Sequence, residues 1–177
     1  MKKQLNGLIF GAVMLAGSVQ AAPILLSPEW AAEACQGWNN NEVLTKRLVV
    51  TEWVNNHKGR GFKVMQIYRS DCPASPRVEM RVSLVDGKAK CVYGGLVQTA
   101  KLETDADYVM WAETTRWKEM GAGEYGPMRA MMFGRLNFQG PKGEAMSNMG
   151  PFEQFLLLAG KGDAAQCPAA APAAPAK

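Results

Sequence analysis

The chain has 177 residues, of which 47% are hydrophobic and 20% charged, and its formal net charge is +4 at pH 7. The basic residues form no run, so the composition argues against a nucleic-acid partner. Beyond residue 21, no segment has the roughly 20 consecutive apolar residues that cross a bilayer as a helix.

The first 21 residues have the pattern of a secretory signal peptide. Two lysines precede a short apolar run, LIFGAVMLA at residues 8–16, which leads into the small residues GSVQAA. Such a run is typical of a signal peptide, although a buried N-terminal helix is the alternative. We therefore expect cleavage near Ala21 and export to the periplasm. Residues 22–166 are then expected to form a single domain, with helices over residues 22–58, and the Pro/Ala-rich residues 167–177 a flexible tail.

All four cysteines, Cys35, Cys72, Cys91 and Cys167, follow the expected cleavage site. An even number in an exported chain favours two disulfides over a metal site, with free buried cysteines as the alternative. No CxxC pair is present, and the single histidine, His57, is far from every cysteine in sequence. We therefore expect neither a metal site nor a cofactor.

The first half of the chain is expected to be helical and then to form strands. Helical spacing extends over residues 28–58, after a Ser-Pro start that is typical of a helix N-terminus, and is interrupted at Asn39, Asn40 and Asn41. Strands are expected at residues 62–69, 77–85 and 88–94, and the last two flank an Asp-Gly turn that predicts a hairpin. Its expected register places Ala89, Cys91 and Tyr93 opposite Leu84, Val82 and Met80.

The second half is expected to alternate strands and short helices. The pattern predicts a strand at 107–112, helices at 114–120 and 127–133, a strand at 135–140, and helices after Pro141 and Pro151. This order favours an α+β fold in which helices cover one face of a mostly antiparallel sheet.

The sequence contains no recognisable catalytic motif. It has neither a GxSxG nucleophile turn nor a phosphate-binding glycine loop. His57 stands in a polar cluster that ends a helix, which is typical of a surface residue. Asp105 and Asp107 precede a strand, where this spacing is typical of a turn. We therefore expect no catalytic residues and a protein that is not an enzyme.

Methionines are concentrated in the second half, and Met128, Met131 and Met132 share one helical face. Methionine adapts to irregular apolar shapes, so these residues predict a pliable wall around an apolar ligand; a packed core is the alternative. The expected ligand-binding residues are Met110, Trp117, Met120, Met128, Met131, Met132, Met146, Met149, Phe152, Phe155 and Leu156.

The segment DADYVMWAETTRWKEMGAGEYGPMRAMMFGRLNFQG at residues 105–140 resembles the core of the sterol carrier protein type 2 family. The positions that match the family pattern are Asp107, Trp117, Gly123, Pro127, Gly134, Leu136 and Gly140. The resemblance implies a five-stranded sheet of order 3-2-1-4-5 with helices over one face and an apolar tunnel between them. It also implies non-covalent binding of a fatty acid, phospholipid, sterol-like or other apolar molecule, with transient membrane contact.

Within that fold, a hypothesis for the disulfides follows from the length of the second N-terminal helix. If helix 41–57 packs antiparallel to strand 62–69, Cys35 lies near Cys72, which leaves Cys91 for Cys167. The alternative to a lipid carrier is a non-catalytic structural or protein-interaction module of the cell envelope with a packed core.

Overall fold

The computed structural model describes residues 21–170, so most of the expected signal peptide and residues 171–177 lie outside the described part. Five strands form one sheet in the order β3-β2-β1-β4-β5. The strands are β1 (Lys63–Arg69), β2 (Val78–Val85), β3 (Lys88–Leu96), β4 (Tyr108–Ala112) and β5 (Asn137–Gln139). Only β1 and β4 pair in parallel, so the predicted α+β fold with a mostly antiparallel sheet is confirmed.

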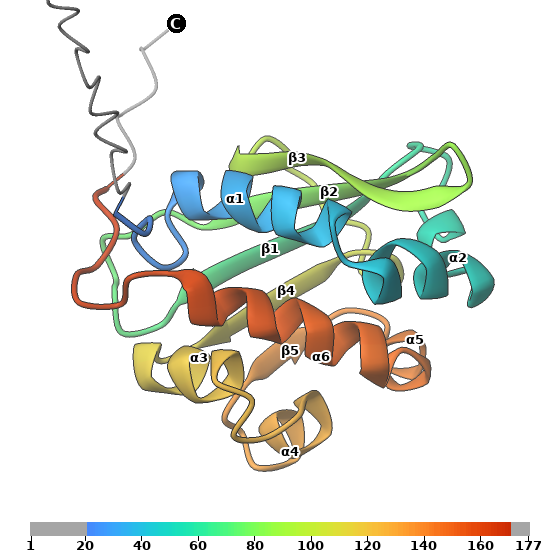
Figure 1. The fold of residues 1–177 in the computed structure, drawn as a ribbon. Helices are drawn as coiled ribbons and strands as arrows, with labels where there is room; N and C mark the ends of the chain where they lie inside the picture. The colour runs from blue at the N-terminus through green and yellow to red at the C-terminus, as the bar shows by residue number, and fades with distance from the viewer. Residues whose placement is uncertain (1–20, 171–177) are drawn as a thin grey trace, which may run out of the picture.

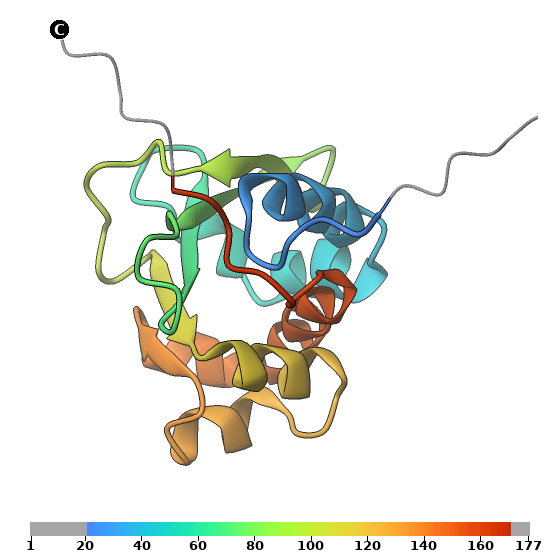
Figure 2. The ribbon, with the colours of Figure 1, turned by 90° about the vertical axis from the view of Figure 1, so that its left-hand side faces the viewer.

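Helices cover one face of this sheet (Figure 1). Those before the sheet are α1 (Pro28–Asn39), a π-helical turn (Val43–Arg47), α2 (Leu48–Val50) and a 3-10 turn (Trp53–Asn55). Those in the second half are α3 (Thr114–Gly121), α4 (Pro127–Met132), α5 (Lys142–Ser147), α6 (Met149–Leu158) and a 3-10 turn (Ala159–Lys161). Figure 2 shows α1 and α6 on one side of the sheet and the connection from β3 to β4 on the other.

The helical segment expected over residues 28–58 is interrupted after Asn39, at the run of three asparagines that also interrupts the sequence pattern. Its start is as predicted, because the Ser27 hydroxyl accepts a hydrogen bond from the Trp30 amide and Pro28 occupies the first turn. At the break, the Asn41 side chain accepts hydrogen bonds from the backbone amides of Val43 and Leu44. Such side-chain bonds compete with a continuous helix, so the chain restarts as separate short turns.

Helix α1 packs along the edge strand β3 rather than along β1. The two approach so closely that a Cβ atom on Gly94 would lie 2.1 Å from the carbonyl oxygen of Ala31. The Asn39 side chain bonds both the amide and the carbonyl of Cys91. This packing places Cys35 beside Cys91, and the two form a disulfide with a Cα–Cα distance of 5.2 Å.

The second disulfide joins Cys72 to Cys167, so the expected pairs Cys35–Cys72 and Cys91–Cys167 are wrong. The expectation placed the N-terminal helices along β1, whereas the C-terminal segment occupies the end of that strand. There the buried Arg69 guanidinium donates to the carbonyl of Gln166, and burial lowers the pKa of Arg69. The first residue of the expected tail is therefore fixed by a disulfide.

The β2–β3 hairpin has a bulge that the predicted register lacks. Val82 faces Cys91 as expected, but an irregularity between Arg81 and Val82 pairs Tyr93 with Arg81 and Met80 with Gly94. The inner face of the hairpin is apolar and buried up to Val82. Leu84, expected on that face, is 48% exposed, whereas Ala89, which pairs with it, is fully buried.

The β3–β4 connection covers part of the outer face of the sheet. Glu79 on β2 is fully buried there, although it stands in the polar half of an alternating strand. Its carboxylate accepts hydrogen bonds from Gln66, from Arg81 and from the amide and hydroxyl of Thr99. These bonds attach the connection to the sheet and leave the helical face as the place for an apolar site.

Candidate functional site

A small cavity lies between the sheet and the helices, with a volume of about 40 Å³. The strands contribute Met65, Tyr108, Met110 and Phe138 to its walls. The N-terminal helices contribute Trp38, Leu44, Leu48 and Trp53, and the C-terminal helices contribute Ala145, Asn148, Pro151, Phe152 and Phe155. An apolar cavity of about 150 Å³ admits benzene, so this cavity has to widen before it can hold a lipid.

Six aromatic rings form a closed circuit around the cavity, and we call them the aromatic ring set. The members in order are Trp38, Trp53, Tyr108, Phe138, Phe152 and Phe155, and Phe155 returns to Trp38. Neighbouring centroids are 5.3–6.4 Å apart, which is the range of favourable aromatic pairs. The circuit joins four separate segments of the chain into one apolar wall.

A second apolar space, which we call the methionine groove, opens on the surface beside α4 and α5. It has a volume of about 500 Å³. Its lining residues are Met128, Met131, Met132, Gly134, Leu136, Asn137, Phe138, Lys142 and Met146. Met128, Met132 and Met146 are 39%, 73% and 46% exposed, so the pliable helix face that the sequence predicts points outward rather than into the cavity.

The cavity and the methionine groove share Phe138 as a wall. Helix α5 separates the two spaces, because Ala145 lines the cavity whereas Lys142 and Met146 line the groove. Phe138 is only partly buried and packs against Tyr108 with a centroid distance of 5.3 Å. Movement of α5 or of the Phe138 ring would therefore join the two spaces.

The residues expected to bind a ligand fall into three groups. Met110, Phe152 and Phe155 line the cavity, and Met128, Met131, Met132 and Met146 line the methionine groove. Trp117, Met120 and Leu156 are fully buried in the core and line neither space, and Met149 is half-buried and lines neither. The structure thus places some of the expected ligand-binding residues at the cavity, some at the methionine groove and others in the packed core.

Sequence reasoning missed most of the aromatic ring set. Trp38 and Trp53 stand in the N-terminal helices. The prediction took the ligand-binding residues from the second half of the chain only and so omitted these two. Tyr108 and Phe138 stand on strands. The alternation of a strand predicts which face of the sheet a side chain occupies, but not whether a cavity lies over that face. The available signal was the pair Trp38 and Trp53, two bulky rings within a single predicted helical segment.

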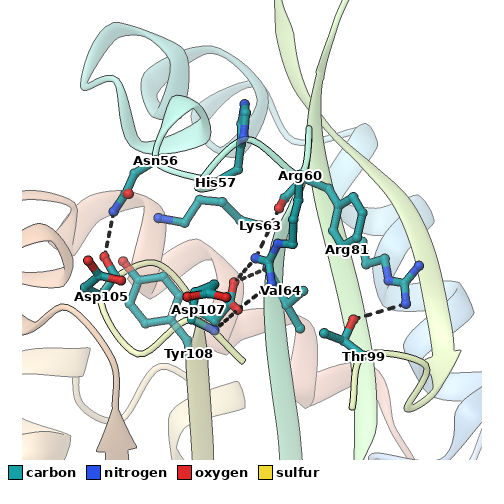
Figure 3. A network of polar contacts seen from close by, with 12 residues as sticks. Asn56, His57, Arg60, Lys63, Val64, Arg81, Thr99, Asp105, Asp107 and Tyr108 are labelled. Atoms are coloured by element: carbon teal, nitrogen blue, oxygen red, sulfur yellow. Dashed lines mark hydrogen bonds and ion pairs between the residues drawn. The ribbon is translucent and has the colours of Figure 1, made fainter. Parts of the chain in front are cut away.

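Asp107 is a structural anchor at the start of β4 (Figure 3). Its carboxylate accepts hydrogen bonds from the amides of Val64 and Glu103 and from the Arg60 guanidinium, which raises the pKa of Arg60. His57 accepts a hydrogen bond from the Gly61 amide at its Nδ1. The bond from the Glu103 amide, four positions away, agrees with the predicted turn at Asp107, and the bond from Val64 ties this turn to β1.

Lys63 places a buried charge beside the cavity, and its side chain is 0% exposed. Its Nζ donates to both carboxylate oxygens of Glu144, at 2.8 and 2.7 Å. The Tyr108 hydroxyl also donates to Glu144 and accepts a hydrogen bond from the Trp53 indole. Burial lowers the pKa of Lys63 despite the carboxylate, and burial raises the pKa of Tyr108.

Within residues 21–170, no three His, Cys, Asp or Glu side chains cluster as metal ligands would. In the same part of the chain, no helix combines the length and the apolar character that crossing a membrane requires.

Several solved structures are similar to this chain. A solution structure of a conserved hypothetical protein of Thermus thermophilus, described as a candidate sterol carrier protein, has a TM-score of 0.51 at 20% identity. That match covers 83% of this chain and 96% of the other. A crystal structure of sterol carrier protein 2 has a TM-score of 0.49 at 20% identity, covering 77% and 98% of the two chains. Sterol carrier protein 2 from Yarrowia lipolytica has a TM-score of 0.41 at 15% identity, covering 79% and 98%.

A search of curated proteins returned no significant match. The model of the SCP-2 sterol transfer family matches residues 27–153, which include both apolar spaces apart from Phe155. The fold and this match agree with the resemblance at residues 105–140, and the chain belongs to the SCP-2 sterol transfer family.

Proposed function

We propose that this protein binds an acyl lipid between its sheet and helices α5 and α6 and exchanges that lipid with a membrane. The observation that carries the proposal is the pair of adjoining apolar spaces, one lined by the aromatic ring set and one formed by the methionine groove. Their shared wall at Phe138 gives a lipid a short path from the surface to the interior. Membership of a family named for sterol transfer supports this function.

Binding requires the cavity to widen, since ligand pockets usually hold about 300–1,000 Å³. Helix α5 is the element best suited to move, because a helix of six residues is not stable alone and depends on its contacts. The floor of the cavity contains Met65 and Met110, whose unbranched side chains adapt to irregular shapes. A sixteen-carbon chain offers on the order of 12 kcal/mol of burial before ordering costs, which leaves room for tight binding.

The rim of the methionine groove is suited to a membrane surface. Met132 is 73% exposed and Phe133 is 69% exposed, so large apolar side chains project from the end of α4. Arg129 on α4 and Lys142 on α5 are exposed near them and provide positive charge. Apolar side chains flanked by cations bind the interface of membranes that contain anionic lipids.

We also infer export to the periplasm, which would place the protein between two membranes. The pattern of residues 1–21 supports a secretory signal, although residues 1–20 lie outside the described residues. The two disulfides support an oxidising compartment, because cytosolic thiols are kept reduced.

The second candidate function is a protein-interaction module with a packed interior, and the cavity volume of about 40 Å³ favours it. Native mass spectrometry of protein purified from the periplasm without detergent separates the two. A carrier is expected to show an excess mass that equals one lipid and that disappears on extraction with organic solvent. A single unliganded mass, with no uptake of added fatty acid or phospholipid, would favour the interaction module.

A further inference from the structure

The buried ammonium of Lys63 lies at one end of the cavity. Lys63 precedes Met65 by two residues, so both side chains point to the inner face of β1, where Met65 lines the cavity. The Nζ atom is 4.3 Å from the centroid of the Trp53 ring and 5.1 Å from that of the Tyr108 ring. Both rings line the cavity, so the positive charge is held beside its wall.

Two donors converge on a single carboxylate at this place. Lys63 donates to both oxygens of Glu144, and the Tyr108 hydroxyl donates to one of them. The Trp53 indole donates to the Tyr108 oxygen at 3.0 Å, which directs the Tyr108 proton toward the carboxylate. The site therefore has the donors and the positive charge that an ionised acid group needs.

The carboxylate that occupies the site, that of Glu144, belongs to α5, the helix that has to move for a ligand to enter. Glu144 lies on α5 next to Ala145, which lines the cavity, and its side chain is 17% exposed. When α5 moves outward to admit a chain, Glu144 leaves Lys63. A buried ammonium that loses its counter-ion is strongly destabilised, so opening is unfavourable unless another anion arrives.

We propose that Lys63 and Tyr108 bind the carboxylate of a free fatty acid, which replaces the Glu144 carboxylate when α5 opens. The inference rests on the proposed function and names its ligand class. A fatty acid restores the same charge and the same pair of acceptor oxygens, while Glu144 turns to solvent. An alcohol or a sterol fills the cavity but leaves the ammonium without a counter-ion.

The first test compares hexadecanoic acid with hexadecanol, which has the same chain without the charge. We expect the wild-type protein to bind the acid about tenfold or more tightly than the alcohol, because only the acid restores the ion pair. Lys63→Met is expected to bring the ratio of the two dissociation constants close to one. Lys63→Arg should keep the preference, and Lys118→Met, at an exposed position on α3, is the matched control for a lost lysine.

The second test does not depend on how the Lys63 variant folds. Glu144→Ala removes the internal occupant, so millimolar acetate should raise the melting temperature of this variant saturably and leave that of the wild type unchanged. Glu153→Ala removes an exposed carboxylate from the neighbouring helix α6 and is expected to show no response to acetate.

The outcomes separate this inference from the proposed function. Equal binding of acid and alcohol, an undiminished preference in Lys63→Met, or no acetate response in Glu144→Ala would each overturn the carboxylate site alone. Binding of hexadecyl phosphate more tightly than the acid would overturn the choice of a carboxylate. If no variant and no wild-type sample binds any of these lipids, the proposed function fails and the site fails with it.

Discussion

Phe138 is the side chain whose position most directly governs access to the cavity. It borders both apolar spaces, and its ring contacts those of Tyr108 and Phe152 within the aromatic ring set. The ring is only partly buried, and it also borders the methionine groove. In the proposed function, the size of this ring would therefore set how easily a lipid chain passes from the surface to the interior.

Phe138→Ala is expected to join the cavity to the groove and to speed lipid uptake. Loss of a partly buried ring should lower the free energy of unfolding by up to about 3 kcal/mol, less than for a fully buried one. Stopped-flow uptake of a fluorescent fatty acid and urea unfolding measure the two effects. Phe138→Leu, which keeps an apolar wall, should take up lipid at nearly the wild-type rate. An unchanged rate in Phe138→Ala would contradict the proposed path.

At the residue scale, the sequence indicates the structural role of some side chains, but it does not identify the distant residues that they contact. The turn role of Asp107 follows from its place before a strand, and the structure confirms it. The pair of Lys63 and Glu144 could not be predicted, because 81 positions separate the two residues. Lys63 also stands in a strand with little alternation, where neighbouring residues do not indicate which face it occupies.

Helix α4 illustrates how far a pattern predicts an element. Pro127 at its start and a glycine after its end delimit it in the sequence as in the structure. Its methionine face could be assigned to one side of the helix but not to a surface or a core. That choice depends on how α4 packs against α6, which no local pattern contains. In the structure, the end of α4 is exposed, at Met132 and Phe133.

The double variant Met132→Ser with Phe133→Ser is expected to slow lipid transfer between vesicles several-fold. These side chains are mostly exposed, so the free energy of unfolding should change by no more than about 0.5 kcal/mol. Transfer of a fluorescent lipid between vesicles that contain anionic lipid measures the effect. Val50→Ser is the matched control, since Val50 is 77% exposed on α2, away from the groove. Equal loss in both variants would contradict docking through α4.

The packing of α1 on β3 depends on a glycine whose role no helical or strand pattern reveals. A Cβ atom on Gly94 would also lie 3.0 Å from Cβ of Cys35, so this contact sits next to the first disulfide. The expectation from helix length placed the following helix, residues 41–57, along strand 62–69 and did not include the contact of α1 with β3. The error in the disulfide pairing follows from this one contact between elements.

Gly94→Ala is expected to lower the free energy of unfolding by about 1–3 kcal/mol, because the added methyl overlaps the Ala31 carbonyl and α1 must shift. Gly150→Ala is the matched control on α6, where a Cβ meets no atom within 4 Å. That change should be neutral or stabilising by up to about 1 kcal/mol, as alanine favours a helix. Urea unfolding of both variants checks the difference, and equal stability would contradict the close approach.

At the scale of the whole molecule, the strand order and the coverage of one sheet face by helices could be predicted. The contact between the N-terminal and C-terminal segments could not. The order β3-β2-β1-β4-β5 agrees with the order that the family resemblance implies. Ile24 and Asp163, near the two ends of the described chain, form a parallel bridge. Contacts between such distant segments leave no repeating pattern in the sequence of either segment. The Pro/Ala-rich composition was therefore the basis for predicting a tail at the end of the chain.

The two disulfides interleave, joining the first cysteine to the third and the second to the fourth. A chain that enters an oxidising compartment N-terminus first delivers Cys35 and Cys72 before either of their partners. Oxidation in order of arrival therefore creates a bond that the folded protein has to break again by thiol exchange. In the proposed periplasmic location, correct maturation of this protein would thus depend on a disulfide isomerase, or on folding that is faster than oxidation.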